Sequence, residues 1–330
     1  MLQRSNDEMD EALVQQSRFM MGIAEETSRV IVGQRAVVER VLVGLLCNGH
    51  VLLEGVPGLA KTLLIRTLGD ALSLRFNRIQ FTPDLLPSDV VGTQVLDARN
   101  GDFKVKHGPV FTNLLLADEI NRAPAKVQSA LLEAMQERQV TLGDHTQALP
   151  DPFIVLATQN PLEHEGTYPL PEAQLDRFML KVLVDYPRRA EEREILRRMT
   201  APVPPRAQPV GSGAQLLAAR EMAGKVHVEA RIFDYVLDLV EATRKPEAHR
   251  LVEMRPLLDG GASPRAGIAL VNAARAFAFL RGRPYVLPED VKAMAPDVLR
   301  HRLVLSYEAE ADRVTPDALI GRLLEGVLVP

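Results

Sequence analysis

One loop constrains the fold of this 330-residue chain more than any other feature. Residues 55–62 read Gly-Val-Pro-Gly-Leu-Ala-Lys-Thr, and apolar runs at 51–53 and 63–65 flank them. This order predicts a buried strand, a glycine-containing loop and the start of a helix. Such a loop turns successive backbone N–H groups toward one point, where the helix dipole also favours an anion. The segment therefore predicts an α/β fold that cradles a phosphate chain.

Two side chains of the loop are expected to bind the ligand directly. Lys61 would lie on the β and γ phosphates, and the Thr62 hydroxyl would take one position on a magnesium ion. The general pattern has glycine before the lysine, whereas this chain has Ala60. The alternative is a plain Pro-Gly turn that happens to precede Lys-Thr. The residues expected around an ATP or GTP molecule are Gly55, Pro57, Gly58, Leu59, Ala60, Lys61, Thr62 and Leu63.

A second motif supplies carboxylates. The four apolar residues 114–117 predict a strand that is buried on both faces, as in a parallel sheet between helix layers. Asp118 and Glu119 would follow at its carboxyl end, where ligands of open α/β sheets bind. We expect Asp118 to hold magnesium through its water shell and Glu119 to orient or deprotonate the attacking water. The alternative is that these acids only cap the next helix.

Two later positions have a possible role at the same edge of the sheet. Asn160 follows the strand-like run 153–158 and would contact the γ-phosphate or position the water; Asn before Pro is equally a turn opener. Arg177 precedes a further apolar run, and its permanent, fork-shaped charge suits a phosphoryl group in transit. Its alternative fate is a surface ion pair, for example with Asp176.

The order of these motifs resembles the MoxR family of AAA+ ATPases. The resemblance is carried by the phosphate loop, Ala-Asp-Glu-Ile-Asn-Arg-Ala-Pro at 117–124, Ala-Thr-Gln-Asn-Pro at 157–161, Thr-Tyr-Pro-Leu-Pro-Glu-Ala-Gln-Leu-Asp-Arg-Phe at 167–178 and Gly-Ala-Ser-Pro-Arg-Ala at 261–266. It covers roughly residues 15–325, and the alanine at position 60 is itself typical of the family.

The resemblance implies a role for each motif. Lys61 and Thr62 would belong to the Walker A loop, and Asp118 and Glu119 to Walker B. Asn160 would be sensor 1, Arg177 the arginine finger that reaches a neighbouring subunit's nucleotide, and Arg265 sensor 2. The residues expected beside the adenine are Val32, Gly33 and Gln34. The family thus implies ATP with Mg²⁺, bound between the subunits of a ring that is commonly a hexamer.

Three local patterns add to this picture. Asn-Gly at 100–101 predicts a hairpin near 94–106, and Gly-Asp at 143–144 predicts another at 139–149. They resemble the helix-2 insert and the pre-sensor-1 hairpin, which mark the clade of AAA+ proteins that contains the MoxR family. In such rings these hairpins tend to face the pore or a substrate; plain surface hairpins are the alternative. Ser263 and Pro264 predict the N-cap and first residue of a helix that carries Arg265 in its first turn.

Length and pattern predict two domains. Residues 1–187 are expected to form a P-loop AAA+ core, with a parallel sheet between helix layers and the two hairpin insertions. Residues 188–330 show helical patterns and are expected to form an all-α lid domain.

Composition excludes several classes of protein. Cys47 is the single cysteine, so no internal disulfide forms and a cytoplasmic location is favoured. Charged residues interrupt the first 20 positions, and we expect neither a signal peptide nor a membrane span. The net charge of −4 does not favour a nucleic-acid partner.

The sequence thus predicts an ATP-hydrolysing ring. From the family resemblance, its output would be remodelling or maturation of a client protein, with a von Willebrand A domain protein as a candidate partner. Three alternatives stay open: a nucleic-acid motor, a magnesium-chelatase-like ATPase subunit, and a nucleotide-gated scaffold that scarcely hydrolyses ATP. The motor would show nucleic-acid-stimulated turnover with a steep salt dependence.

Overall fold

The computed structural model describes residues 2–97, 102–161 and 167–330. By their internal contacts the residues form two compact units. The first, called here the sheet unit, comprises Gly22–Phe178 and Val182–Leu217. The second, called the helical unit, comprises Met1–Met21, Met179–Lys181 and Ala218–Pro330.

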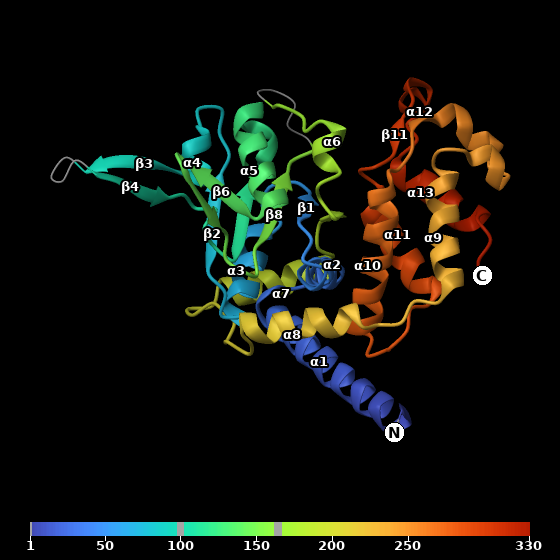
Figure 1. The fold of residues 1–330 in the computed structure, drawn as a ribbon, viewed down its shortest axis with the longest axis horizontal. Coiled ribbons are helices and arrows are strands. Elements are labelled where there is room, and N and C mark those ends of the chain that lie inside the picture. The colour runs from blue at the N-terminus through green and yellow to red at the C-terminus, as the bar shows by residue number, and fades with distance from the viewer. Residues whose placement is uncertain (1, 98–101, 162–166) are drawn as a thin grey trace. The chain divides into compact units, whose positions relative to one another are not determined.

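A five-stranded sheet forms the centre of the sheet unit (Figure 1). Its strand order is β2-β5-β8-β1-β9, and the pairs β2–β5, β5–β8 and β1–β8 are parallel. The strands are β1 (Val51–Glu54), β2 (Phe76–Gln80), β5 (Leu114–Asp118), β8 (Ile154–Gln159) and β9 (Leu180–Leu183). The first two residues of β9 are grouped with the helical unit by their contacts. The parallel sheet expected from the apolar runs is confirmed.

Helices cover this sheet because its central strands are apolar on both faces. Leu115 and Ala117 of β5 share one buried cluster with Val127 and Leu131 of α5. Each of these four side chains is at most 1% exposed. The sheet unit contains α2 (Arg35–Leu46), α3 (Lys61–Ala71), α4 (Pro87–Val91), η1 (Ile120–Arg122), α5 (Ala125–Glu137), α6 (Glu172–Leu175) and α7 (Arg189–Met199). Two further helices, α1 (Leu2–Val30) and α8 (Gly213–Gly224), have residues in both units.

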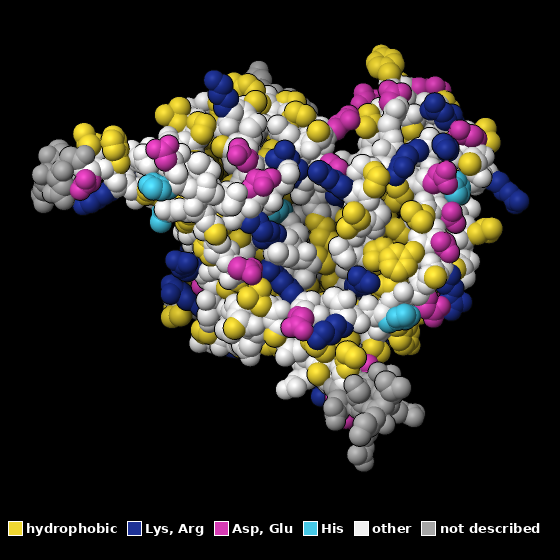
Figure 2. All heavy atoms as spheres, in the orientation of Figure 1, with side chains coloured by type: hydrophobic (Ala, Val, Ile, Leu, Met, Phe, Trp, Pro, Cys, Tyr) yellow, Lys and Arg dark blue, Asp and Glu magenta, His cyan; other side chains and the backbone are white. Residues whose placement is uncertain are grey.

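Both predicted hairpins are present. Strands β3 (Gly92–Asp97) and β4 (Asp102–His107) pair in antiparallel fashion and project from the sheet (Figure 1), although the Asn-Gly turn lies outside the described residues. Strands β6 (Gln139–Leu142) and β7 (His145–Ala148) form the second hairpin. Hydrophobic side chains lie exposed near the outer end of the first hairpin (Figure 2), and they belong to Val95, Leu96 and Phe103.

The helical unit is built around α10 (Pro264–Leu280), which contacts α9 (Ala230–Ala242) and α11 (Pro288–Leu299). It also contains α12 (Tyr307–Ala311), α13 (Pro316–Gly326), η2 (Pro246–His249), η3 (Val252–Leu257) and the short strand pair β10 (Leu258–Gly260) and β11 (Val304–Leu305). The lid that follows the core is therefore mainly helical, as expected. None of the helices in the described part of the chain is both long and apolar enough to cross a membrane.

The contacts divide the chain at other points than the boundary expected after Pro187. Residues 188–217 group with the sheet, partly because Arg198 of α7 donates to the backbone carbonyls of Ser28 and Arg29 at the end of α1. Residues 179–181 group with the helices. The division into a core at 1–187 and a lid at 188–330 stays a prediction.

Candidate nucleotide site

The phosphate loop joins β1 to α3 and is shaped by residues with left-handed backbone. Gly58 has φ 88°, and Ala60 has φ 56° just before the first residue of α3. The left-handed region costs a residue with a Cβ about 1–2 kcal/mol, so Ala60 holds strain at the start of the helix. Gly55 is needed for space, because a Cβ there would lie 2.5 Å from the carbonyl oxygen of Val184.

Lys61 is held by the loop itself. Its ammonium donates to the backbone carbonyls of Gly55 and Val56, the latter at 3.2 Å. Burial lowers the pKa of Lys61, while the charges of Asp118 and Glu119 oppose that shift. The first residue of α3 therefore presents a cation that is already folded back over the loop.

The two carboxylates lie at the carboxyl ends of the central strands. Asp118 ends β5, and Glu119 follows with a left-handed backbone at φ 57°. The Thr158 hydroxyl on the neighbouring β8 donates to Asp118 at 2.5 Å and accepts the backbone N–H of Glu119 at 2.8 Å. One buried threonine thus holds both the acid that ends the strand and the strained turn after it.

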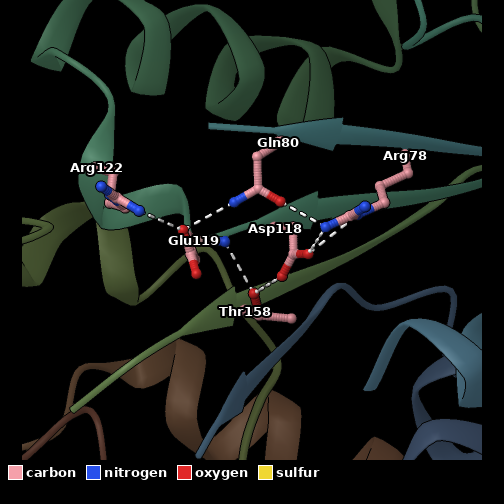
Figure 3. Close-up of polar contacts among 6 residues, drawn as sticks. All are labelled: Arg78, Gln80, Asp118, Glu119, Arg122 and Thr158. Carbon is pink, nitrogen blue, oxygen red and sulfur yellow. Dashed lines mark hydrogen bonds and ion pairs between the residues drawn. The ribbon is translucent and has the colours of Figure 1, made fainter. Parts of the chain in front are cut away.

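Side chains of the edge strand β2 complete this network (Figure 3). Arg78 donates to one oxygen of Asp118 from two nitrogens, at 2.7 and 3.0 Å, and also donates to Gln80. The Gln80 amide in turn donates to Oε2 of Glu119 at 2.8 Å, and Arg122 donates to the same oxygen at 3.0 Å. Glu119 is therefore oriented from two sides through a single oxygen.

A cavity of about 410 Å³ joins the loop to these strand ends. Its lining residues are Pro57, Gly58, Leu59, Ala60, Lys61, Thr62, Leu63, Arg78, Gln80, Asp118, Glu119, Thr158 and Asn160. The structure thus brings the predicted loop residues from Pro57 to Leu63, both predicted carboxylates and the predicted Asn160 to one place, whereas the predicted Gly55 does not line this cavity. A second, mostly apolar cavity of about 90 Å³ shares Gly58, Leu59, Ala60 and Leu63 with the first.

Residues far apart in the sequence line this second cavity. Val32 and Gln34, both expected beside the base, lie here, and Gly33 joins them in the chain with φ 67°. The Gln34 side chain donates to the backbone carbonyl of Asp185 at 2.9 Å, which ties the segment to the end of the sheet. Other lining residues are Val30, Ile31, Pro187, Ile195, Arg198 and Met199. A small apolar space beside a larger polar one suits a base next to a phosphate chain.

The donor set fits magnesium. Thr62 and Asp118 offer oxygen atoms at the same cavity, and Mg²⁺ prefers one or two protein oxygens with the rest of its shell from phosphates and water. Within residues 2–97, 102–161 and 167–330, no group of three or more His, Cys, Asp or Glu side chains gathers as a dedicated metal cage.

The two predicted arginines lie elsewhere. Arg177 does not line the 410 Å³ cavity; it lines a separate cavity of about 240 Å³ together with Glu133 and Glu137 of α5. No hydrogen bond or ion pair of its guanidinium is found among the described residues, so the ion pair with Asp176 considered above is not formed. Arg265 belongs to the helical unit, where Ser263 caps α10 by accepting its backbone N–H at 3.2 Å, as predicted.

Comparison with known proteins agrees with this site. Residues 50–180 match the ATPase family associated with various cellular activities (AAA), and residues 249–323 match the AAA lid domain. The chain is 54% identical to a protein named chaperone MoxR1 from Mycobacterium tuberculosis, over 92% of this chain and 81% of that protein. It is 35% identical to the protein MoxR of Paracoccus denitrificans, over 91% and 93% of the two chains. This chain belongs to the MoxR family of AAA+ ATPases.

Other relatives extend the family. The MoxR-family chain is 43% identical to the uncharacterized protein YeaC of Bacillus subtilis, over 93% of each. A crystal structure from Cytophaga hutchinsonii, described as that of an ATPase candidate, has a TM-score of 0.93 at 47% identity and covers 100% of this chain and 99% of its own. A full-length MCM homologue from Methanopyrus kandleri has a TM-score of 0.58 at 20% identity, over 90% and 62% of the chains, which shows a shared fold alone.

The contacts of Gln80 lead to one prediction for this MoxR-family site. Gln80→Ala is expected to leave ATP affinity unchanged and to lower kcat roughly tenfold, because small misplacements of a catalytic group are costly. ATP titration and steady-state ATPase assays would measure both quantities. Gln215→Ala, at an exposed glutamine of α8, is the matched control. An unchanged or increased kcat in Gln80→Ala would contradict a positioning role.

Proposed function

We propose that this chain hydrolyses ATP with magnesium at a site shared between neighbouring subunits of a ring. The observation that carries the proposal is the 410 Å³ cavity, which gathers Lys61, Thr62, Asp118, Glu119 and Asn160 but not Arg177. The Arg177 guanidinium lies outside the phosphate cavity of its own subunit and has no partner among the described residues, as a finger that acts on a neighbour requires. The adjoining apolar cavity supports adenine as the base.

Each residue has a task in this proposal. The loop amides and Lys61 bind the phosphates. Thr62 and Asp118 would hold magnesium, whose positive charge would stabilise the negative charge that develops on the phosphates. Glu119, oriented by Gln80 and Arg122, accepts the proton of the attacking water. Asn160 positions that water or the γ-phosphate, Arg177 of a neighbouring subunit stabilises the transferred phosphoryl group, and Arg265 of the lid senses the nucleotide.

The task that ATP hydrolysis would drive is proposed from the family. We infer a cytoplasmic hexameric ring, with 1–187 as the motor core and 188–330 as the lid, that remodels a client protein beside a von Willebrand A domain partner. The name of the Mycobacterium tuberculosis relative, a chaperone, supports this reading. The exposed apolar hairpin β3–β4 supports contact with protein rather than with nucleic acid, and the net charge of −4 agrees.

The ATPase rate per subunit against protein concentration tests the shared site. The rate is expected to rise steeply with concentration, because dilution separates the loop from the finger, and to vanish when EDTA removes magnesium. Arg177→Ala should stay near the background rate throughout. A rate per subunit that stays constant down to concentrations at which mass photometry shows only monomers would refute the shared site.

A further inference from the structure

Two buried arginines of the helical unit donate hydrogen bonds to the backbone of the residues that follow Arg177. Arg302 donates to the backbone carbonyl of Met179 at 3.2 Å and to that of Val298 in α11. Arg300 donates to the backbone carbonyl of Lys181. The two arginines are only 8% and 9% exposed, so these bonds form in a largely water-free setting.

Arg300 is itself held firmly. Its guanidinium binds Asp317 of α13 through two nitrogens, with the shortest contact at 2.7 Å, and Asp297 of α11 at 2.9 Å. A planar fork with several donors fixes its partners in direction as well as in distance. The carbonyl of Lys181 is therefore tied to both helices through one side chain.

In the sequence, Arg177 lies between the residues bonded to Arg302 and Arg300 and a second set of backbone hydrogen bonds. On its N-terminal side, the backbone N–H groups of Arg177 and Phe178 donate to the carbonyls of Gln174 and Leu175 in α6, at 3.2 and 3.0 Å. On its C-terminal side, Met179 is only two residues away, and the intervening Phe178 is fully buried. The backbone thus has hydrogen bonds on both sides of Arg177 in the sequence, within the sheet unit before it and within the helical unit after it, while its guanidinium has no partner among the described residues.

We propose that Arg302 and Arg300 are positioning residues that set the arginine finger, and so let the helical unit of one subunit control hydrolysis in its neighbour. This inference rests on the proposed function, since it needs Arg177 to act in trans. The alternative is that the two arginines only stabilise the helical unit. The alternatives differ in which half of a shared site a variant damages.

Arg302→Met is the variant of choice, because it keeps an apolar stem of similar volume and removes the guanidinium that donates to the carbonyls of Met179 and Val298. Its ATPase rate is expected to fall at least tenfold with ATP affinity unchanged, and Arg302→Lys should fall less. Arg283→Met is the matched control: it breaks a pair with the buried Asp290 in the same unit, and the contacts of Arg283 found among the described residues are to Tyr285 and Asp290. It is expected to lower the melting temperature and keep the rate.

Mixing two variants identifies which half of the shared site is damaged in Arg302→Met. Arg302→Met retains its loop, so mixing it with Lys61→Ala, which retains its finger, should restore activity. Mixing it with Arg177→Ala should restore none, since both lack a working finger. The reverse pattern, or no rescue by either, would refute this inference alone, provided that the reference mixture of Lys61→Ala with Arg177→Ala recovers activity. No recovery in the reference mixture would refute the shared site and this inference with it.

Discussion

Lys61→Ala is expected to weaken ATP binding by roughly 100-fold or more and to reduce hydrolysis to background. Truncating one partner of a desolvated, hydrogen-bonded charge pair costs about 2–5 kcal/mol, and each 1.4 kcal/mol is a factor of about ten in affinity. In this chain the ammonium is half-buried over the loop and faces the cavity that holds both acids. No other lysine lines that cavity.

Titration calorimetry or a fluorescent ATP analogue would measure this loss. The matched control is Lys225→Ala, which removes an exposed lysine that pairs with Glu221 in the same helical turn. Its ATP affinity should equal that of the wild type. Wild-type affinity in Lys61→Ala would show that the loop is a plain Pro-Gly turn.

Glu119→Gln is expected to separate binding from turnover. Glutamine keeps the shape and can still accept the bonds from Gln80 and Arg122, but it cannot take a proton from water. Loss of a general base lowers rates by about 100- to 10,000-fold. ATP affinity should stay the same, because Thr62, Asp118 and Lys61 are untouched.

Single-turnover assays with radiolabelled ATP would show bound, uncleaved nucleotide in Glu119→Gln. Glu221→Gln, at an exposed acid of the helical unit, is the control and should turn over normally. A Glu119→Gln protein with normal turnover would remove Glu119 from the reaction. A protein that neither binds nor turns over ATP would point to collapse of the strained turn at φ 57° instead.

Most of the catalytic side of the site is predictable from the sequence because it depends on local order. A loop between a strand and a helix, and acids that directly follow an apolar run, place their side chains through the geometry of those elements alone. The structure accordingly brings Lys61, Asp118 and Asn160 to one cavity. The hairpins were predictable for the same reason, since turn residues select them.

The residues that orient the acids could not be found in this way. Arg78 and Gln80 lie on the edge strand β2, whose sequence Phe-Asn-Arg-Ile-Gln has one buried residue, Ile79, and so lacks the apolar run that reveals a central strand. The polar side chains of Arg78 and Gln80 on either side of the apolar Ile79 were the available signal. Their value depended on knowing that β2 pairs with β5, which is a non-local fact.

Backbone strain was equally hidden. The general pattern has glycine where this chain has Ala60, and the structure gives the reason for the usual glycine: the position is left-handed. Ile195 and Met199 of α7 line the second, mostly apolar cavity, and this also depends on tertiary contacts over more than 100 residues.

The most direct test of the shared site is the ATPase rate of an equimolar mixture of Lys61→Ala and Arg177→Ala, compared with each variant alone. Each variant should be inactive by itself. In a mixed ring, about one interface in four would pair an intact loop with an intact Arg177, so the mixture should recover up to roughly a quarter of the wild-type rate. A mixture as inactive as its components, from variants that still assemble with wild-type mass, would contradict an ATPase site completed by a neighbouring subunit.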